Sequence, residues 1–130
     1  MNKDLFKPGA FSWFELMTDD AEAAKDFYGK LFGWKMEKYP VEDGDYWVVK
    51  IGDDGVAGIM KKPAEAGPAP NFWAIYVTVD DVDKVAETAK ALGAWLLVPP
   101  MDIPKIGRFT TFMDPQGAVI SAIAYAPMEA

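Results

Sequence analysis

The chain has 130 residues, 51% of them hydrophobic, and its 20 acidic residues outnumber its 13 basic residues to give a net charge of −7. This length predicts one domain, residues 1–130, with a sizeable core. The acidic balance without clustered basic residues argues against binding to nucleic acid or to an anionic membrane surface. The chain has no Cys and no His, which excludes disulfides, thiolate nucleophiles, Ser-His-Asp triads and zinc sites built on His or Cys.

The sequence indicates no targeting or membrane-spanning segment. The first residues, MNKDLFKPGA, lack the apolar core of a secretory signal. The apolar stretches fall well short of the roughly 18 residues that cross a bilayer. We therefore expect a cytoplasmic protein.

The first half of the chain predicts a strand, a helix and three more strands, at residues 11–17, 20–32, 34–39, 45–51 and 55–60. Apolar residues spaced along one helical face indicate the helix: Ala21, Ala24, Tyr28 and Leu31. Asp19 with Glu22 three residues later resembles a capping box. Gly33 is typical of a helix C-terminus.

The second half predicts the same order of elements after a linker. The linker, at about residues 62–70, lies in the Pro- and Ala-rich stretch KKPAEAGPAP. The elements that follow are a strand at 72–79, a helix at 82–92 and strands at 95–98, 107–113 and 118–125. Asp80 with Asp83 resembles a second capping box, and Gly93 is the second C-terminal glycine.

The two halves align as an internal repeat. TDDAEAAKDFYGKLFGW aligns without gaps with VDDVDKVAETAKALGAW, which brings Trp34 onto Trp95. With one extra residue inserted in the second half, the alignment continues and brings Tyr46 onto Arg108 and Gly55 onto Gly117. The sequence therefore predicts two βαβββ units, at about residues 10–61 and 71–126.

Three motifs together resemble the vicinal oxygen chelate superfamily: FELMTDDAEAAKDFYGKLFGW, VTVDDVDKVAETAKALGA and GRFTTFMDPQGAVI. This superfamily includes glyoxalase I, bleomycin-resistance and fosfomycin-resistance proteins and extradiol dioxygenases, and the chain looks most like its small bacterial glyoxalase-like members. The resemblance implies an α+β fold in which two tandem βαβββ units form a cup-shaped mixed sheet, with the helices on the convex face. It also implies a ligand in the cup and a homodimer.

The resemblance also marks the positions that hold a metal ion in other members. One ligand lies on the first strand and one on the last strand of each unit. Carried onto this sequence by the family's spacing, these positions are Trp13, Ile59, Ala74 and Ser121. Trp, Ile and Ala side chains do not coordinate metals, and a neutral Ser is a poor ligand. We therefore expect no metal and no other cofactor.

Strand alternation predicts which side chains line the cup. Glu15 shares a face with Trp13, whereas the opposite face of this strand is apolar. A carboxylate in a partly apolar pocket can act as an acid or base, which makes Glu15 the catalytic candidate. The alternative is that Glu15 pairs with Lys50 or Arg108. The residues expected to contact a ligand are Trp13, Glu15, Trp47, Tyr76, Thr78, Arg108 and Ser121.

Three functions follow from this interpretation. The favoured one is a metal-free protein that binds a small apolar, aromatic or cationic molecule, with indole rings for stacking and hydroxyls for orientation. The second is an enzyme, either a lyase or isomerase that uses Glu15 as its base, or a metal-dependent enzyme of the dioxygenase type. The third is a structural or regulatory dimer module whose own side chains fill the cup.

Overall fold

The computed structural model describes residues 3–41, 44–63, 70–103 and 106–126. Its internal contacts divide the chain into two compact units. Unit 1 is Trp13–Ala74, and unit 2 is Ile75–Ala130 together with Asn2–Ser12. Residues 64–69, the larger part of the predicted linker, lie outside the described residues.

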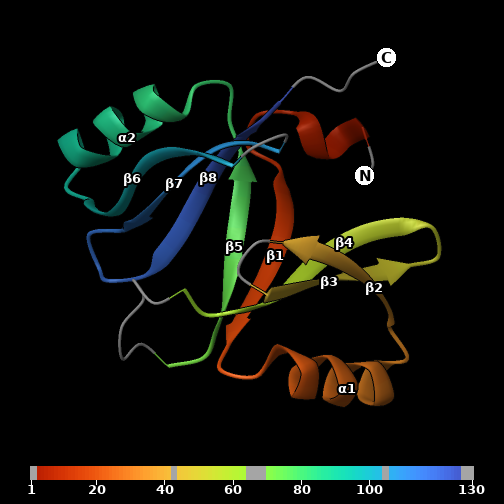
Figure 1. Cartoon of the computed structure of the whole chain (residues 1–130). Coiled ribbons are helices and arrows are strands. Elements are labelled where there is room, and N and C mark those ends of the chain that lie inside the picture. The colour runs from red at the N-terminus through yellow and green to blue at the C-terminus, as the bar shows by residue number, and fades with distance from the viewer. Residues whose placement is uncertain (1–2, 42–43, 64–69, 104–105, 127–130) are drawn as a thin grey trace. The chain divides into compact units, whose positions relative to one another are not determined.

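Unit 1 has one helix and four strands of a mixed sheet (Figure 1). Its elements are β1 (Phe11–Thr18), α1 (Ala21–Phe32), β2 (Lys35–Val41), β3 (Gly44–Ile51) and β4 (Asp54–Lys61). The strand order is β2-β3-β4-β1. β1 and β4 are parallel, and the other two neighbouring pairs are antiparallel.

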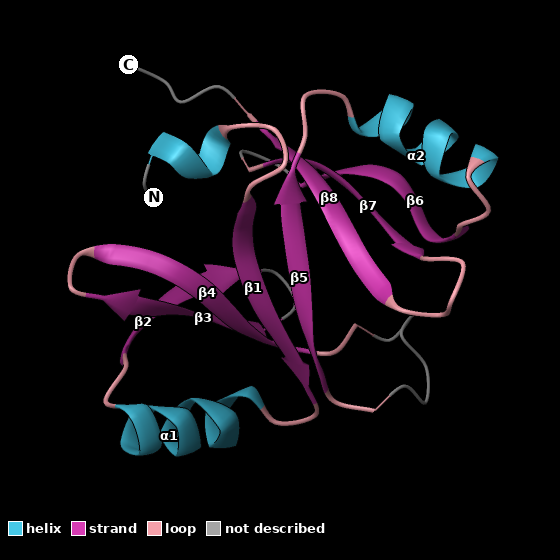
Figure 2. Ribbon diagram, turned by 180° about the vertical axis from the view of Figure 1, so that it is seen from behind, coloured by secondary structure: helices cyan, strands magenta, loops and turns pink. Residues whose placement is uncertain are grey.

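Unit 2 repeats this arrangement, with α2 packed against three of its four strands (Figure 2). Its elements are β5 (Phe72–Thr78), α2 (Val82–Ala91), β6 (Trp95–Ile103), β7 (Gly107–Met113) and β8 (Val119–Tyr125). The strand order is β5-β8-β7-β6, with β5 parallel to β8. The α+β class and the two βαβββ units are thus confirmed.

The main difference from the predicted elements is the length of β6. The sequence predicts a strand at 95–98, but β6 continues to Ile103 through Pro99 and Pro100. Proline removes a backbone donor, which a strand at the end of a sheet order tolerates. The register of β6 with β7 also shifts twice, between Leu96 and Val98 and between Val98 and Met101.

Each helix begins one residue later than its predicted capping box. The Asp20 carboxylate accepts a hydrogen bond from the backbone N–H of Ala23 at 3.0 Å. Asp81 accepts one from Lys84, also at 3.0 Å. The capping residues are therefore Asp20 and Asp81 rather than Asp19 and Asp80, because only the later residue can reach the free N–H groups of the first turn.

The core of unit 1 lies between its sheet and α1. Leu16, Val49, Ala57 and Ile59 are buried there, with Ala21, Ala24 and Tyr28 of α1 packed against them. Successive strand residues point to opposite faces. Glu15 and Gly58, which are paired in register between β1 and β4, therefore lie on the face turned away from α1. We call this the helix-distal face.

The faces of unit 2 are assigned by an ion pair. Arg108 of β7 holds Asp83 of α2, so Arg108 points to the helix side and its neighbour Phe109 points away from it. Tyr76 pairs with Ser121, and Ser121 pairs with Thr111, which lies two residues after Phe109. The helix-distal face of unit 2 therefore carries Phe109, Tyr76, Thr111 and Ser121.

The first residues of the chain, through the start of β1, pack on unit 2. Gly9 N–H donates to Thr78 O and Thr78 N–H donates to Ala10 O, both at 2.8 Å. The Ser12 and Tyr125 hydroxyls lie 2.7 Å apart. Burial raises the pKa of Tyr125, and the hydrogen bond with Ser12 opposes that shift. Residues 3–12 thus complete unit 2 rather than unit 1.

The strand registers correct the repeat alignment. Glu15 is paired with Gly58, and its counterpart Tyr76 is paired with Ser121. Gly58, not Ile59, therefore corresponds to Ser121, and the last strands are offset by one residue more than the sequence predicts. The two register shifts in β6 account for the larger offset. The expected equivalence of Ile59 with Ser121 is wrong, and Ile59 lies in the core beneath α1.

No helix in the described ranges could span a membrane. Neither α1 nor α2 has the length and apolar character to cross a bilayer.

Candidate functional site

Three polar side chains meet on the helix-distal face of unit 1. The Trp13 indole N–H donates to the Tyr46 hydroxyl at 3.1 Å, and that hydroxyl donates to a Glu15 carboxylate oxygen at 2.6 Å. Glu15 is only 9% exposed. The Tyr46 hydroxyl thus links an indole donor to a buried carboxylate, and a short hydrogen bond of this kind fixes the position of both partners.

Gly58 makes this arrangement possible. Tyr46 lies on β3 and Glu15 on β1, so the phenol must cross β4, the strand between them. A Cβ atom built on Gly58 would lie 1.7 Å from the Tyr46 hydroxyl oxygen and 2.2 Å from the carbon that bears it. The phenol therefore occupies the space that any other residue at position 58 would fill with its side chain.

The helix-distal face of unit 2 has a different character. The rings of Tyr76 and Phe109 meet edge to face, with 6.3 Å between centroids. The hydroxyls of Thr111 and Ser121, which are directly opposed across β7 and β8, are 2.7 Å apart. Ser121 is buried, at 3% exposed. This face carries an aromatic pair beside a satisfied pair of hydroxyls.

The structure brings some of the expected ligand contacts together and separates others. Trp13 and Glu15 meet in unit 1, and Tyr76 and Ser121 are neighbours in unit 2. Thr78 also lies in unit 2, where its hydroxyl donates to the backbone carbonyl of Leu5 in the segment before β1.

Two expected contacts lie on the helix side instead. Trp47 packs against the core of unit 1, with the Lys25 ammonium 4.6 Å from the centre of its ring. Arg108 binds Asp83 through two hydrogen bonds of 2.9 Å and Asp102 through one of 3.0 Å. Neither side chain shares a face with Glu15 or Ser121, so we leave both out of the candidate site.

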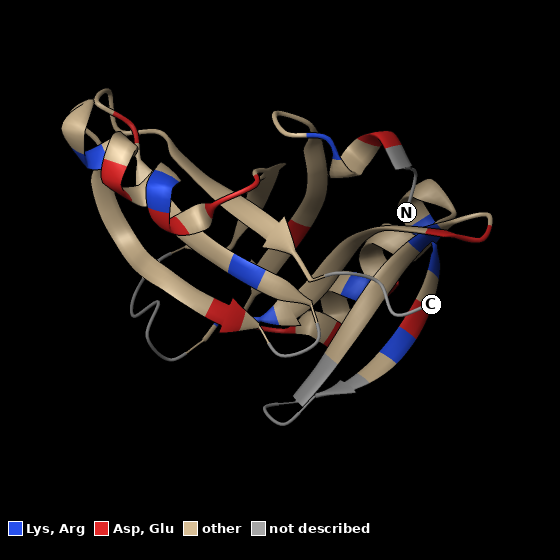
Figure 3. Cartoon of the chain, turned by 90° about the horizontal axis from the view of Figure 1, so that it is seen from above, with Lys and Arg blue, Asp and Glu red and all other residues tan. Residues whose placement is uncertain are grey.

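Several charged side chains near the surface are paired locally. Besides Arg108 with Asp83, Lys50 pairs with Glu37 at 3.1 Å. The hydrogen bonds from Arg108 hold the pKa of Asp83 below its usual value, and Glu37 raises the pKa of Lys50. Acidic and basic residues are interspersed along the ribbon (Figure 3). The sequence offered Lys50 and Arg108 as partners of Glu15, but these two cations are engaged with surface acids.

Comparison with known proteins identifies the family. Residues 10–121 match the model of the glyoxalase/bleomycin resistance protein/dioxygenase superfamily. The chain belongs to this superfamily. The resemblance found in the three sequence motifs is thereby confirmed.

Two relatives from the curated proteins are similar over nearly the whole chain. CFP32 of Mycobacterium tuberculosis, named as a proposed glyoxylase, is 38% identical over 122 residues, which are 93% of this chain and 46% of CFP32. DnrV of Streptomyces peucetius, an anthracycline biosynthesis protein, is 30% identical over 95% of this chain and 50% of its own length. The chain thus spans about half the length of the curated relatives it matches.

Solved structures agree on the fold. Methylmalonyl-CoA epimerase from Mycobacterium tuberculosis has a TM-score of 0.66 at 13% identity, covering 98% of this chain and 93% of the epimerase. At this identity the likeness establishes a glyoxalase-type fold, not a shared activity.

The residues present do not fit the metal ion that many superfamily members use. With the corrected register, the corresponding positions hold Trp13, Gly58, Ala74 and Ser121. None of these has a carboxylate, imidazole or thiolate, and the Ser121 hydroxyl is engaged with Thr111. Within the described residues, no three His, Cys, Asp or Glu side chains are grouped to hold a metal.

Sequence reasoning missed Tyr46, Gly58 and Thr111. If the two halves had been aligned with an offset one residue larger, Tyr46 would have matched Phe109 and Gly58 would have matched Ser121. The strands around these positions pair in the same way in both units. The signal was a glycine within a strand, which often marks a close approach of another group. The register shifts in β6 concealed it, since only the paired backbone reveals them.

Proposed function

We propose that this chain binds a small apolar, aromatic or cationic molecule without a metal ion, and that Glu15 is the polar anchor for that molecule. The hydrogen-bonded chain Trp13–Tyr46–Glu15 carries the proposal. A buried carboxylate held by a phenol is a directional acceptor for a donor or a cation on a ligand. The adjacent Trp13 indole offers a flat apolar surface on which a planar ring stacks.

Two further features support a binding role. The carboxylate and its phenol are held in place before a ligand arrives, which reduces the ordering that binding requires. One relative is named for anthracycline biosynthesis, which makes an anthracycline a suitable first probe. Neither cytoplasmic location nor freedom from cofactors is tested by these features, and both stay predictions.

The test is a titration with an anthracycline and with a panel of simpler aromatic amines, followed by tryptophan fluorescence and calorimetry. We expect Glu15→Gln to weaken the binding of an amine at least about tenfold, the effect of losing a charged hydrogen bond. The matched control is Glu87→Gln, which removes the same charge from the exposed side of α2. Equal binding by both variants, or no binding by any probe, would contradict the proposal.

An isomerase or lyase is the second candidate, favoured by the 2.6 Å hydrogen bond between Tyr46 and Glu15. In an isomerisation the Glu15 carboxylate would take a proton from a carbon next to a carbonyl group and return it to the neighbouring carbon. No oxidant, reductant or metal is needed for this exchange. Tyr46 would remain hydrogen-bonded to Glu15 and keep the carboxylate oriented toward the substrate carbon.

Solvent deuterium exchange distinguishes the two candidates. The probe is the hemithioacetal of methylglyoxal and glutathione, incubated with the chain in deuterium oxide and observed by NMR. Enzyme-dependent deuterium at carbon that falls about a hundredfold or more in Glu15→Gln would support the enzyme. Exchange that Glu15→Gln leaves unchanged would exclude Glu15 as the base.

A further inference from the structure

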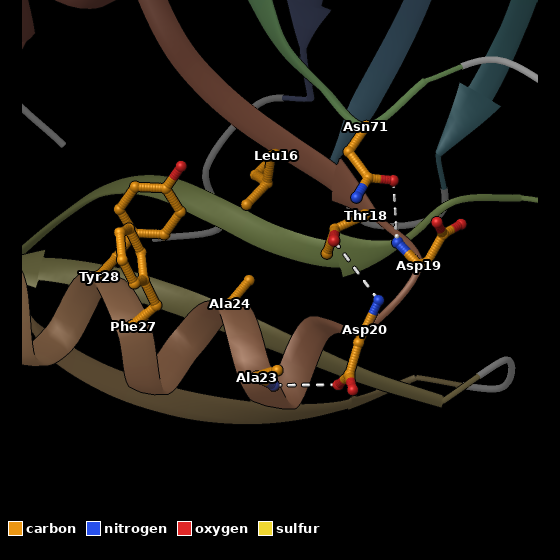
Figure 4. A pocket seen from close by; sticks show the side chains of 9 residues that line it. All are labelled: Leu16, Thr18, Asp19, Asp20, Ala23, Ala24, Phe27, Tyr28 and Asn71. Carbon is orange, nitrogen blue, oxygen red and sulfur yellow. Dashed lines mark hydrogen bonds between the residues drawn. The ribbon is translucent and has the colours of Figure 1, made fainter.

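A pocket of about 330 Å³ lies on the helix side of unit 1, between the end of β1 and the first half of α1 (Figure 4). We call it the α1 pocket and define it by Thr18, Asp20, Ala23, Phe27, Tyr28 and Asn71. Its volume is near the lower limit of small-molecule pockets, which span roughly 300–1,000 Å³. Thr18 and Glu15 alternate in direction along β1 and point to opposite faces of the sheet. The α1 pocket is thus separate from the helix-distal face.

The two ends of the α1 pocket differ in character. The rings of Phe27 and Tyr28 stand at one end, Leu16 lies in the middle, and Thr18 and Asp20 lie at the other end (Figure 4). The two rings meet edge to face with 5.0 Å between centroids, and Phe27 is 58% exposed. Such a pocket fits a molecule that has an apolar ring at one end and a polar group at the other.

The polar end presents hydrogen-bond acceptors. Thr18 is only 6% exposed, and its hydroxyl oxygen accepts from the Asp20 N–H at 3.4 Å. The Asn71 side-chain oxygen accepts from the Asp19 N–H at 3.1 Å. One carboxylate oxygen of Asp20 accepts from the Ala23 N–H at 3.0 Å. An oxygen that accepts one hydrogen bond retains a lone pair for a second, so this end favours a ligand group that donates.

Asp20 supplies the negative charge at the polar end. Its neighbour Asp19 is paired with Lys62 at 3.0 Å, whereas no Lys or Arg of the described ranges forms an ion pair with Asp20. The Asp20 carboxylate already occupies an N–H group in the first turn of α1, which makes that turn a poor site for an anionic ligand. An ammonium group has three donors and a positive charge, and it complements both the acceptors and Asp20.

Unit 2 has a related pocket that contains a cation of its own. This pocket, of about 720 Å³, lies between the end of β5 and α2. In the ungapped alignment of the two helices, Asp81 of this pocket corresponds to Asp20, and Lys84 corresponds to Ala23. Unit 2 therefore has an ammonium group at a position where unit 1 has only a methyl group. The α1 pocket leaves that position open to an ammonium group from a ligand.

The rings at the apolar end are also particular to unit 1. Phe27 and Tyr28 correspond to Thr88 and Ala89, which both line the pocket of unit 2. The fold of a βαβββ unit therefore forms without rings at these two positions. The rings and the missing lysine occur in the same pocket, which combines an apolar wall with a carboxylate that no cation of the described chain neutralises.

We propose that the α1 pocket is a second ligand site and that it binds a small arylalkylamine. The ammonium group of the ligand lies at Asp20 and Thr18, and its aromatic ring packs against Phe27 and Tyr28. The volume of the pocket favours an amine with a single ring over a molecule with several fused rings. The site does not depend on the function proposed for Glu15, because the two lie on opposite faces of the sheet.

The test is a titration of the isotope-labelled chain with phenethylamine, followed by NMR of the backbone amides. We expect saturable shifts at Thr18, Ala23 and Tyr28. Asp20→Asn removes the charge but keeps the helix cap, since Asn caps as well as Asp. It is expected to raise the dissociation constant at least about tenfold. The matched control is Asp81→Asn, which makes the same change in unit 2 and is expected to leave binding unaltered.

A second variant, Ala23→Lys, gives the α1 pocket the cation that Lys84 supplies in unit 2. Ala23 is exposed, so the longer side chain is tolerated, and circular dichroism verifies the fold. We expect this variant to lose the binding of phenethylamine, and we expect the uncharged analogue 2-phenylethanol to bind the wild-type chain at least about tenfold more weakly than the amine.

Three results would overturn the proposal. The first is the absence of saturable shifts along α1 in the wild-type chain. The second is binding that survives both Asp20→Asn and Ala23→Lys, or that Asp81→Asn weakens equally. The third is a set of shifts confined to Glu15 and Gly58, which would place the amine on the helix-distal face and support the function proposed for Glu15 instead.

Discussion

The helix-distal faces of the two units share a backbone and differ in chemistry. At matching positions unit 1 has Glu15 and Gly58, where unit 2 has Tyr76 and Ser121. The third strand contributes Tyr46 in unit 1 and Phe109 in unit 2. Unit 1 therefore carries a carboxylate and a phenol, whereas unit 2 carries two rings and two hydroxyls.

The difference follows from one missing side chain. Because Gly58 has no Cβ, the Tyr46 phenol crosses β4 and reaches Glu15. Ser121 has a Cβ and a hydroxyl, and that hydroxyl turns to Thr111 in the neighbouring strand. The residue at this one position therefore decides where the polar groups meet. In unit 1 they meet across an intervening strand, and in unit 2 they meet between neighbouring strands. Each of the following substitutions tests one part of this contrast.

Gly58→Ala is expected to have the largest effect. The new methyl group would lie 1.7 Å from the Tyr46 hydroxyl oxygen, so the phenol must move and Glu15 must lose that donor. We expect a loss of about 2–4 kcal/mol from the free energy of unfolding, measured in urea. In a Tyr46→Ala background the same substitution should cause little further loss, since the clash is gone. An equal loss in both backgrounds would show that Gly58 matters for another reason.

Tyr46→Phe tests the hydroxyl without disturbing the packing of the ring. It removes one hydrogen bond to a buried carboxylate, and we expect a loss of about 1.5–3 kcal/mol, measured by urea unfolding. The reciprocal change in unit 2, Phe109→Tyr, adds a hydroxyl where no carboxylate corresponds to Glu15. It is expected to alter stability by less than about 1 kcal/mol. Similar losses of unfolding free energy in the two variants would contradict the proposed difference between the helix-distal faces of the two units.

Val48→Thr gives unit 1 the hydroxyl that Thr111 supplies in unit 2. Val48 is buried and stands opposite Gly58, which has no side chain to receive that hydroxyl. We therefore expect a loss of about 1–2 kcal/mol from a change that preserves shape. Ser121→Ala, which leaves the Thr111 hydroxyl without its partner across the strands, is expected to lose about 1 kcal/mol. A stabilised Val48→Thr variant would show that the hydroxyl finds a partner within unit 1.

The smallest expected effect concerns the exposed acids of the two helices. Hydrogen bonds from Arg108 lower the pKa of Asp83 from 3.8, and Lys25 lowers the pKa of Asp26 in the same direction. A carboxyl whose pKa is lower in the folded chain stabilises it above the unfolded pKa, and this contribution is lost as the pH falls through the folded value. Asp83→Asn should therefore slightly lower the thermal midpoint at neutral pH and leave it unchanged in strong acid.

Asp26→Asn serves as the comparison from unit 1, and we expect a smaller change because Lys25 is its neighbour in sequence. Thermal midpoints measured from neutral pH down to below 3.8 would test both variants. An Asp83→Asn variant that loses stability equally at every pH would indicate that the ion pair is not the cause.

The sequence predicted the elements well because its strongest patterns are local. The spacing of Ala21, Ala24, Tyr28 and Leu31 marks one helix, and its repetition marks the other. Strand alternation likewise placed Trp13 and Glu15 on one face. These predictions require only neighbouring residues, and the structure agrees with the helix and strand bounds apart from the length of β6.

The site depended on register, which local patterns do not fix. A register slip of one residue moves every side chain of a strand to the opposite face of the sheet. Because of two such slips in β6, the predicted alignment of the two halves matched Ser121 with Ile59 instead of Gly58. It also gave Tyr46 the wrong counterpart in unit 2. Trp47 and Arg108 were assigned to the ligand for the same reason, since the faces of β3 and β7 were not determined by their residues alone.

The packing of residues 3–12 on unit 2 has a consequence for the order of folding. Unit 1 is one continuous stretch, and its parallel strands β1 and β4 are joined through its own residues. Unit 2 must instead bring Ser12 to Tyr125 across 113 positions of sequence. Contacts this distant require closure of a long loop before they gain any stability, and they slow folding accordingly. During synthesis, unit 1 can therefore fold first, whereas the residues before it can complete their packing on unit 2 only after β8 has been made.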